Sequence, residues 1–314
     1  MSFLRARPSV VIYALISAYL IAIAWGSHSL TTLALVASSL VMFAVTWHSA
    51  ARLLGGGAAL KFIAIALSAG WFAEQMGSTH GWFFGEYDYT EVLGPRLGEV
   101  PVVIPMMWFT LCYAGYVIAN LIVWRTPVDA SPSWGNFVLL SFIAAMIVTA
   151  FDLGADPYLV FVLKAWIMRK TDGAWFGETV QGFFGWMFVS FFIVACFRLA
   201  TRATAWPPMT PSLRRHALVP MGLYACGMVF QMVLGHPVEI RTIAFFAMGM
   251  PLACALAGWL HGRFATAAEV QASSTATPAQ IAAFPAPVLH ALGQLLRGIR
   301  FAGDFQRHQV RALR

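Results

Sequence analysis

The chain has 314 residues, of which 60% are hydrophobic and only 11% are charged, and its formal net charge is +7. This composition is far from that of water-soluble domains and is typical of a polytopic membrane protein. The four cysteines all lie within apolar runs and show no Cys-x-x-Cys spacing, which argues against a disulfide framework or a zinc site.

Apolar runs of about 17–25 residues are long enough for an α-helix to cross a bilayer. Eight such runs predict an all-α, polytopic membrane helical bundle: 10–25, 30–47, 58–76, 101–124, 134–151, 180–199, 216–234 and 239–260. An even number of spans places both termini on one side. Fifteen of the twenty lysines and arginines fall on that side, so the positive-inside rule predicts cytoplasmic termini in a bacterial cytoplasmic (inner) membrane. The positive charge then reflects topology, and no motif indicates a nucleic-acid partner.

The predicted organisation has three parts. A transmembrane helical domain over 1–263 carries the active site. Residues 264–287 are rich in Ala, Ser, Thr and Pro, which predicts a flexible linker. Residues 288–314 combine an apolar stripe with five arginines, which predicts an amphipathic basic helix on the lipid surface.

The connection over 81–101 is unusual because it is both acidic and aromatic. It contains Glu86, Asp88, Glu91 and Glu99 together with Trp82, Phe83, Phe84, Tyr87 and Tyr89. Function concentrates in the loops between membrane helices, so this composition indicates an apolar substrate handled by carboxyl groups near the membrane surface.

A second group of acids follows the fifth span. Asp156 before Pro157 is typical of a helix start, which predicts a short helix over about 157–170 that lies in the interface or re-enters the membrane. Asp152 and Glu74 lie near the ends of spans. A charge in a span is costly, by about 2.5–3.5 kcal/mol at the helix centre, so a functional role is indicated for both. Glu178 lies farther along the same connection, beside Trp175.

Cofactor motifs are not visible in the sequence. The eight histidines are scattered singly, without the clusters that a histidine-bound metal centre needs, and no glycine-rich nucleotide motif occurs. We therefore expect no metal and no cofactor.

Two blocks of sequence resemble the integral-membrane carotenoid biosynthesis family, which includes carotenoid 1,2-hydratases. The first block contains Phe84-Gly85, Tyr87-Asp88-Tyr89-Thr90, Val92-Leu93-Gly94-Pro95, Val100-Pro101, Ile104-Pro105 and Trp108-Phe109. The second contains Asp152-Leu153, Asp156-Pro157, Trp175-Phe176-Gly177 and Phe184-Gly185-Trp186. The resemblance implies a polyene substrate in the bilayer and leaves other carotenoid biosynthesis enzymes as candidate partners.

The residues and the resemblance together lead to a hypothesis of cofactor-independent hydration of the terminal C=C of an acyclic carotenoid. A buried acid protonates the alkene and water adds to the cation. Candidate catalytic residues are Asp152, Asp156, Asp88, Glu74 and Glu178, and candidate substrate-binding residues are Trp82, Phe84, Tyr87, Tyr89, Trp108 and Trp175.

Within this set we expect Asp152 to donate the proton, Asp156 or Asp88 to position water, and Glu74 to shape the acidity of the donor. Two alternatives remain. An end-group cyclase would begin from the same protonated alkene but exclude water. A transporter or lipid-binding protein would use the acids as an ion or proton path.

Overall fold

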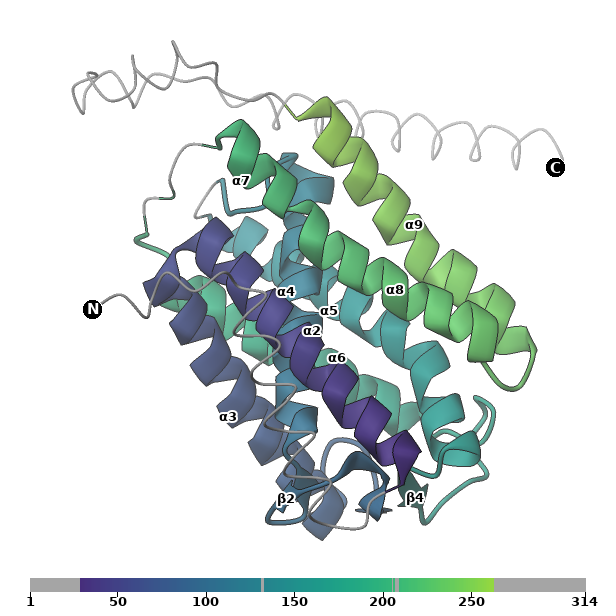
Figure 1. The fold of residues 1–314 in the computed structure, drawn as a ribbon. Helices are drawn as coiled ribbons and strands as arrows, with labels where there is room; N and C mark the ends of the chain where they lie inside the picture. Colours follow the sequence, from purple (N-terminus) through teal and green to yellow (C-terminus); the bar gives the residue numbers. More distant parts are fainter. Residues whose placement is uncertain (1–28, 131–132, 205, 207–208, 263–314) are drawn as a thin grey trace, which may run out of the picture. The chain divides into compact units, whose positions relative to one another are not determined.

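The computed structural model describes residues 29–130, 133–204, 206 and 209–262, which all belong to one compact unit. Helices dominate this part of the chain (Figure 1). The α-helices are α2 (Leu30–Leu54), α3 (Gly56–His80), α4 (Val103–Trp124), α5 (Trp134–Pro157), α6 (Val180–Ala200), α7 (Pro211–His216), α8 (Leu218–Leu234) and α9 (Glu239–His261). The strands are β1 (Tyr87–Tyr89), β2 (Arg96–Leu97), β3 (Val100–Pro101) and β4 (Trp166–Met168).

Seven helices in the described part of the chain are long and apolar enough to cross a membrane, with α7 and α8 counted as one span. The predicted all-α, polytopic membrane bundle is therefore confirmed. The run 10–25, the linker 264–287 and the helix 288–314 lie outside the described residues, so the total number of spans and the side of the termini stay predictions.

Hydroxyl side chains begin several of these helices. Ser29, Ser133, Thr179 and Thr210 each accept a hydrogen bond from the backbone amide three residues later. Such N-caps satisfy one of the amides that a helix start leaves free. The polar residues between the apolar runs therefore define where four of the helices begin.

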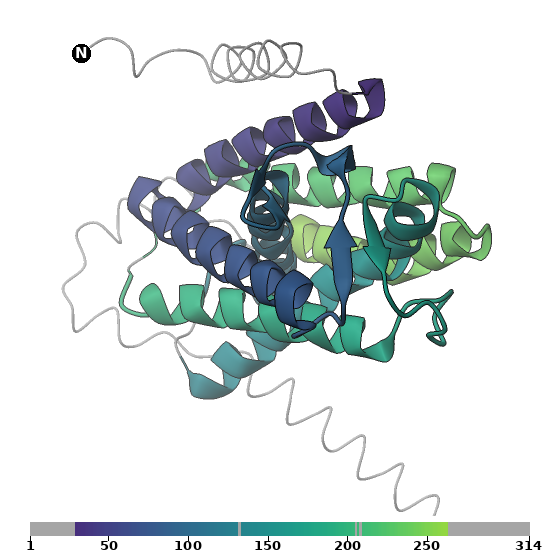
Figure 2. The ribbon, with the colours of Figure 1, turned by 90° about the horizontal axis from the view of Figure 1, so that it is seen from below.

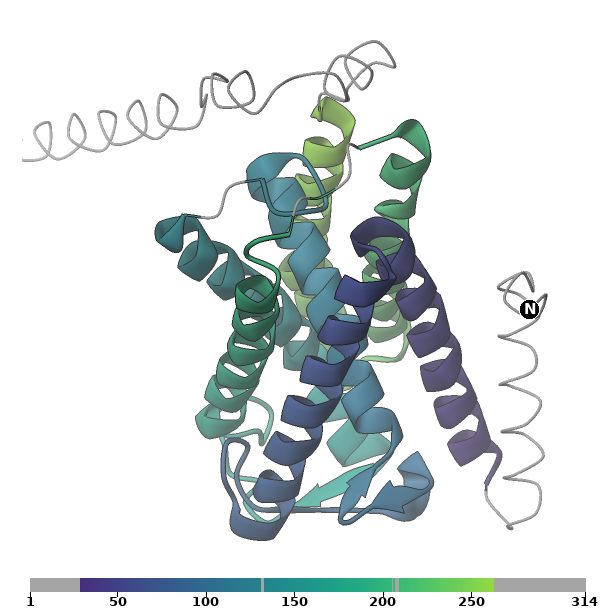
Figure 3. The ribbon, with the colours of Figure 1, turned by 90° about the vertical axis from the view of Figure 1, so that its left-hand side faces the viewer.

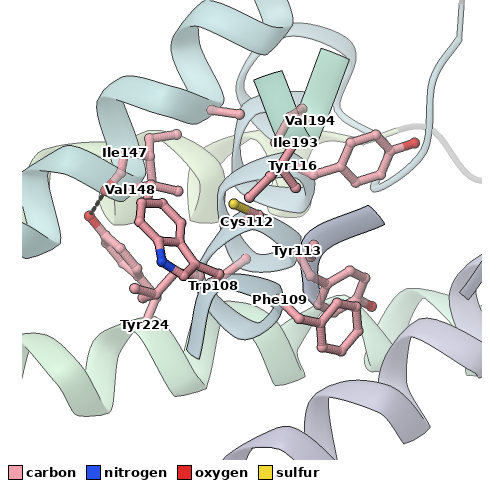
Figure 4. Close-up of a cluster of buried hydrophobic side chains, with 14 of the residues drawn as sticks. Trp108, Phe109, Cys112, Tyr113, Tyr116, Ile147, Val148, Ile193, Val194 and Tyr224 are labelled. Carbon is pink, nitrogen blue, oxygen red and sulfur yellow. Dashed lines mark hydrogen bonds between the residues drawn. The ribbon is translucent and has the colours of Figure 1, made fainter. Parts of the chain in front are cut away.

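Helix α4 is the centre of the bundle and the most deeply buried of the spans. It packs against α2, α3, α5, α6, α8 and α9, and Trp108, Tyr113 and Tyr116 are among its fully buried side chains (Figure 4). Gly115 allows a close approach to α5, since a Cβ at this position would lie 2.8 Å from the carbonyl oxygen of Ala144. Small residues bring membrane helices together in this way.

A small cap, formed by residues 81–101 and 163–179, closes one end of the bundle (Figure 2). In it β1 pairs with β4 in an antiparallel register that places Tyr87 opposite Met168 and Tyr89 opposite Trp166. The two acidic connections, about 80 residues apart in the sequence, therefore meet over the same end of the bundle.

The helix predicted over 157–170 is wrong. Helix α5 continues through Asp156 to Pro157, a π-helical turn follows at Tyr158–Val162, and the chain then enters β4. Asp156 is therefore in the last turn of a helix and is not an N-cap. Proline can also end a helix, because it has no amide hydrogen to continue the backbone pattern. The later part of the predicted helix is extended instead, because β4 pairs with β1.

Candidate active site

Glu74 lies near the cap end of α3 and is only 5% exposed. Its Oε2 accepts hydrogen bonds from the hydroxyls of Tyr87 (2.5 Å) and Tyr89 (2.7 Å), and its Oε1 accepts one from the indole Nε1 of Trp108 (2.9 Å). Burial, and then the charge of Glu74, hold the pKa of Tyr87 and of Tyr89 well above the usual range. Both hydroxyls therefore stay protonated and act as donors, so Glu74 is a fully satisfied acceptor.

Two glycines on α3 make room for the partners of Glu74. A Cβ at Gly70 would lie 2.8 Å from the ring of Trp108, and a Cβ at Gly77 would lie 2.8 Å from the hydroxyl of Tyr87. Both lie on the same side of the helix as Glu74, four residues before it and three after it. Glycine inside a helix costs up to about 1 kcal/mol relative to alanine, and here it allows the donors to reach the carboxylate.

Asp152 and Asp156, which we call the acid pair, lie four residues apart and therefore on the same face of α5. This spacing of one helical turn brings their carboxyl groups close to each other, and both line the same cavity. Asp152 is 1% exposed, and neither of its oxygens, nor Oδ1 of Asp156, receives a hydrogen bond from another group in the described part of the chain. Closely spaced buried acids cannot both be ionised, so this geometry allows the pair to share one proton.

Hydrogen bonds from other elements fix the end of α5 that carries the acid pair. Pro157 has no amide to bond the carbonyl of Leu153, and the indole Nε1 of Trp175 donates to that carbonyl instead, at 2.8 Å. On α8, the hydroxyl of Tyr224 donates to the carbonyl of Ile147 (2.6 Å; Figure 4) and Nε2 of Gln231 donates to that of Phe151 (2.7 Å).

Glu178 comes from the cap and is 3% exposed. It ends a tight turn in which Phe176 and Gly177 have positive φ angles of 51° and 96°, and its amide donates to the carbonyl of Trp175 at 2.8 Å. Burial, and then the nearby charge of Asp156, raise the pKa of Glu178 to about 8. The same short segment therefore holds the end of α5 through Trp175 and brings a third carboxyl group to the acid pair.

An apolar cavity of about 290 Å³ connects these groups. Glu74, Asp152, Asp156 and Glu178 all line it, and most of the remaining wall is aromatic or aliphatic. The aromatic lining residues are Phe84, Tyr87, Tyr89, Trp108, Phe151, Trp166, Trp186, Tyr224 and Phe230. Among the described residues, no lysine, arginine or histidine lines this cavity. Because four neighbouring acids without a cationic partner would repel one another if all were ionised, at least one carboxyl group is expected to be protonated.

Most of the site residues predicted from sequence lie in this cavity, and three do not. Asp88 is exposed and forms an ion pair with Arg169, with 3.5 Å between Oδ2 and Nε. Trp82 is 52% exposed on the cap. Trp175 is outside the lining and instead holds α5. Of the predicted acids, the structure brings together Glu74, Asp152, Asp156 and Glu178 but not Asp88.

Sequence reasoning did not select Trp166, Trp186 or Tyr224, which also line the cavity. The ring of Trp186 lies 4.4 Å from that of Trp108, measured between centroids. Trp186 belongs to the Phe-Gly-Trp segment quoted for the family resemblance, so the sequence carried a signal for it. Trp166 lies in the range for which the sequence predicts a helix but is part of strand β4, and Tyr224 lies within an apolar span.

The raised pKa of Glu178 predicts a pH-dependent stability. Below its ordinary value of 4.5 the acid is protonated in both the folded and the unfolded chain, and the stability that it contributes is lost as the pH rises toward about 8. Replacing Glu178 with Gln should therefore raise the midpoint of thermal unfolding relative to the parent more at about pH 8.5 than at about pH 5. An equal difference at both pH values, measured in detergent, would contradict the burial of this acid.

The fold and the cavity define a multi-pass membrane protein with an apolar, acid-lined site. A sequence model of a family described as "Carotenoid biosynthesis protein" matches residues 29–272. The chain therefore belongs to the carotenoid biosynthesis protein family, and its role is in carotenoid biosynthesis.

A comparison with curated proteins finds a relative with a more specific name. The chain is similar to the bisanhydrobacterioruberin hydratase of Haloarcula japonica, with 29% identity over 131 residues. This match covers 41% of the chain and 41% of the relative. No solved structure matches the chain.

Proposed function

We propose that this chain hydrates the terminal C=C of an acyclic carotenoid end group. The observation that carries the proposal is the acid pair, Asp152 and Asp156, which faces an apolar cavity without any donor from other described residues. The name of the similar Haloarcula japonica protein, a hydratase of bisanhydrobacterioruberin, supports the same reaction class.

In the proposed mechanism, the protonated carboxyl group of Asp152 gives its proton to one alkene carbon. The π electrons form the new C–H bond and leave a tertiary carbocation on the neighbouring carbon. The oxygen of a water molecule then attacks this cation, and Asp156 accepts the proton that the water releases. Because the two carboxyl groups lie one helical turn apart in the same cavity, the proton returns from Asp156 to Asp152, and the net change is the addition of one water.

The other cavity residues have supporting roles in this proposal. The ring faces of Trp108 and Trp186 can stabilise the cation, and each such contact contributes about 0.5–2 kcal/mol. Glu74 accepts hydrogen bonds from three donors, so in this proposal it shapes the acidity of the acid pair and does not donate the proton. Glu178 keeps its proton at neutral pH because its pKa is about 8, and it adds a second source of acid.

Location and topology form part of the same proposal. The distribution of basic residues supports cytoplasmic termini in a bacterial cytoplasmic (inner) membrane, which puts the cap and the acid pair at the outer face. The substrate is then a polyene dissolved in the bilayer, and other carotenoid biosynthesis enzymes supply it or use its product.

Expression of the chain in bacteria that make lycopene tests the function. We expect a pigment heavier than lycopene by one water, detected by liquid chromatography and mass spectrometry, and absent from cells that carry the empty vector. An isomer of unchanged mass would support end-group cyclisation instead. If pigments stay unchanged in hosts that make lycopene and in hosts that make bisanhydrobacterioruberin, the hydratase proposal is wrong.

A further inference from the structure

One side of the cavity is exposed, and it lies between α2 and α8. Of all the residues that line the cavity, the three exposed ones are Ser38 on α2 and Cys226 and Phe230 on α8. Every other lining residue is buried or half-buried, including those from α3, α4, α5, α6 and the cap. The cavity is therefore covered at the cap and exposed at its side.

Helices α2 and α8 come together at one end only. Away from the cap, Oγ of Ser49 on α2 lies 3.4 Å from the carbonyl oxygen of His216, just before α8, and the rings of His48 and His216 are 6.0 Å apart. Toward the cap the two helices diverge (Figures 1 and 3). The exposed lining residues lie in this diverging part.

The two sides of this opening lie at a common depth. Ser38 follows the first residue of α2 by eight positions, and Cys226 precedes the last residue of α8 by eight. At 1.5 Å per residue, each lies about 12 Å from the cap end of its helix, within the thickness of the hydrocarbon core. Small side chains, Ser38, Ser39, Cys226 and Gly227, line the cavity here and leave space between the helices.

We propose that this opening, the portal formed by Ser38, Cys226 and Phe230, admits the linear polyene chain of the substrate sideways from the bilayer. The inference rests on the proposed function, because it takes the acid pair as the position of the reacting end group. The cavity volume of about 290 Å³ is at the lower limit of small-molecule sites, which range from roughly 300 to 1,000 Å³. The cavity therefore holds one end group, and the rest of the chain extends through the portal into lipid.

A bulky side chain at the portal tests the proposal without depending on catalysis. The full-length chain, carrying Asp152→Asn so that bound pigment is not converted, is purified from lycopene-producing cells. Retained pigment per protein is then measured by absorbance. We expect Cys226→Trp and Ser38→Trp to lower it by about tenfold, because indole fills the space that the polyene needs. Cys254→Trp is the matched control, since Cys254 is exposed on α9 and does not line the cavity; it should retain as much pigment as the parent.

The outcomes separate this inference from the proposed function. Loss of pigment in both portal variants, at normal protein yield, supports the portal even if the unsubstituted chain adds no water to lycopene. Normal retention in both variants overturns the portal even if the unsubstituted chain is an active hydratase. A parent protein that retains no lycopene also overturns it.

Discussion

Replacing Asp152 with Asn is expected to abolish formation of the hydrated product. A positioned general acid contributes about 10²- to 10⁴-fold to a rate, and the amide of asparagine is not acidic enough to protonate an alkene. The substitution keeps the size of the side chain, and neither oxygen of Asp152 receives a hydrogen bond in the described part of the chain, so the fold should be preserved. Product in lycopene-producing cells, normalised to the amount of chain in the membrane, gives the measurement.

The matched control is Asp88→Asn, which makes the same chemical change at an exposed residue. Its ion pair with Arg169 is solvent-exposed on both sides, and such pairs contribute about 1 kcal/mol or less. We expect a much smaller loss of product than in Asp152→Asn. Equal loss in both variants, or normal turnover by Asp152→Asn, would contradict the role of Asp152 as the proton donor. Equal loss would also make Asp88 a candidate for a catalytic role.

Replacing Glu74 with Ala is expected to produce a large loss of stability. The change leaves the hydroxyls of Tyr87 and Tyr89 and the indole N–H of Trp108 without their acceptor in a buried site. Each unsatisfied buried donor costs about 1–3 kcal/mol, so the total should reach about 3 kcal/mol or more. Thermal unfolding of the purified protein in detergent, followed by loss of the monodisperse gel-filtration peak, measures this effect.

Glu74→Gln is the control for this experiment, because glutamine fills the same space and its carbonyl oxygen still accepts a hydrogen bond. Tyr89→Phe removes only one of the three donors and leaves Glu74 with Tyr87 and Trp108. Both variants should lose clearly less stability than Glu74→Ala. If the alanine variant were as stable as the glutamine variant, the three hydrogen bonds would not hold the cap on α3.

The helical part of the fold could be predicted because the bilayer sets the length of each apolar run. All seven spans that the structure describes begin or end within a few residues of the predicted ranges. Helices α2 and α5 extend beyond the predicted runs 30–47 and 134–151, to Leu54 and Pro157. The extensions contain Arg52 and the acid pair, and these charged residues interrupt the apolar pattern that marks a span. Polar residues buried by neighbouring helices are not distinguished by hydropathy from residues in a loop.

The acids of the site could be predicted because a carboxyl group within a span costs free energy, and such a residue therefore indicates a function. Their partners could not, because these depend on contacts between distant segments. Asp88 and Glu178 look alike in the sequence, since each is an acid in a loop that also contains aromatic residues. Pairing of β1 with β4 directs Asp88 to solvent, whereas the tight turn at Phe176 directs Glu178 to the cavity.

The hydrogen bond between Trp175 and the carbonyl of Leu153 has a consequence for protein engineering. Helix α5 cannot complete its own last turn, because Pro157 removes the donor for the carbonyl of Leu153. Trp175 in the cap, 22 positions after Leu153, supplies a donor instead. The same stretch of cap carries Glu178. A chimera that exchanges α5 alone with a relative would separate the acids from the indole that fixes them, so α5 and the connection through Glu178 form the smallest unit that can be transplanted with its chemistry intact.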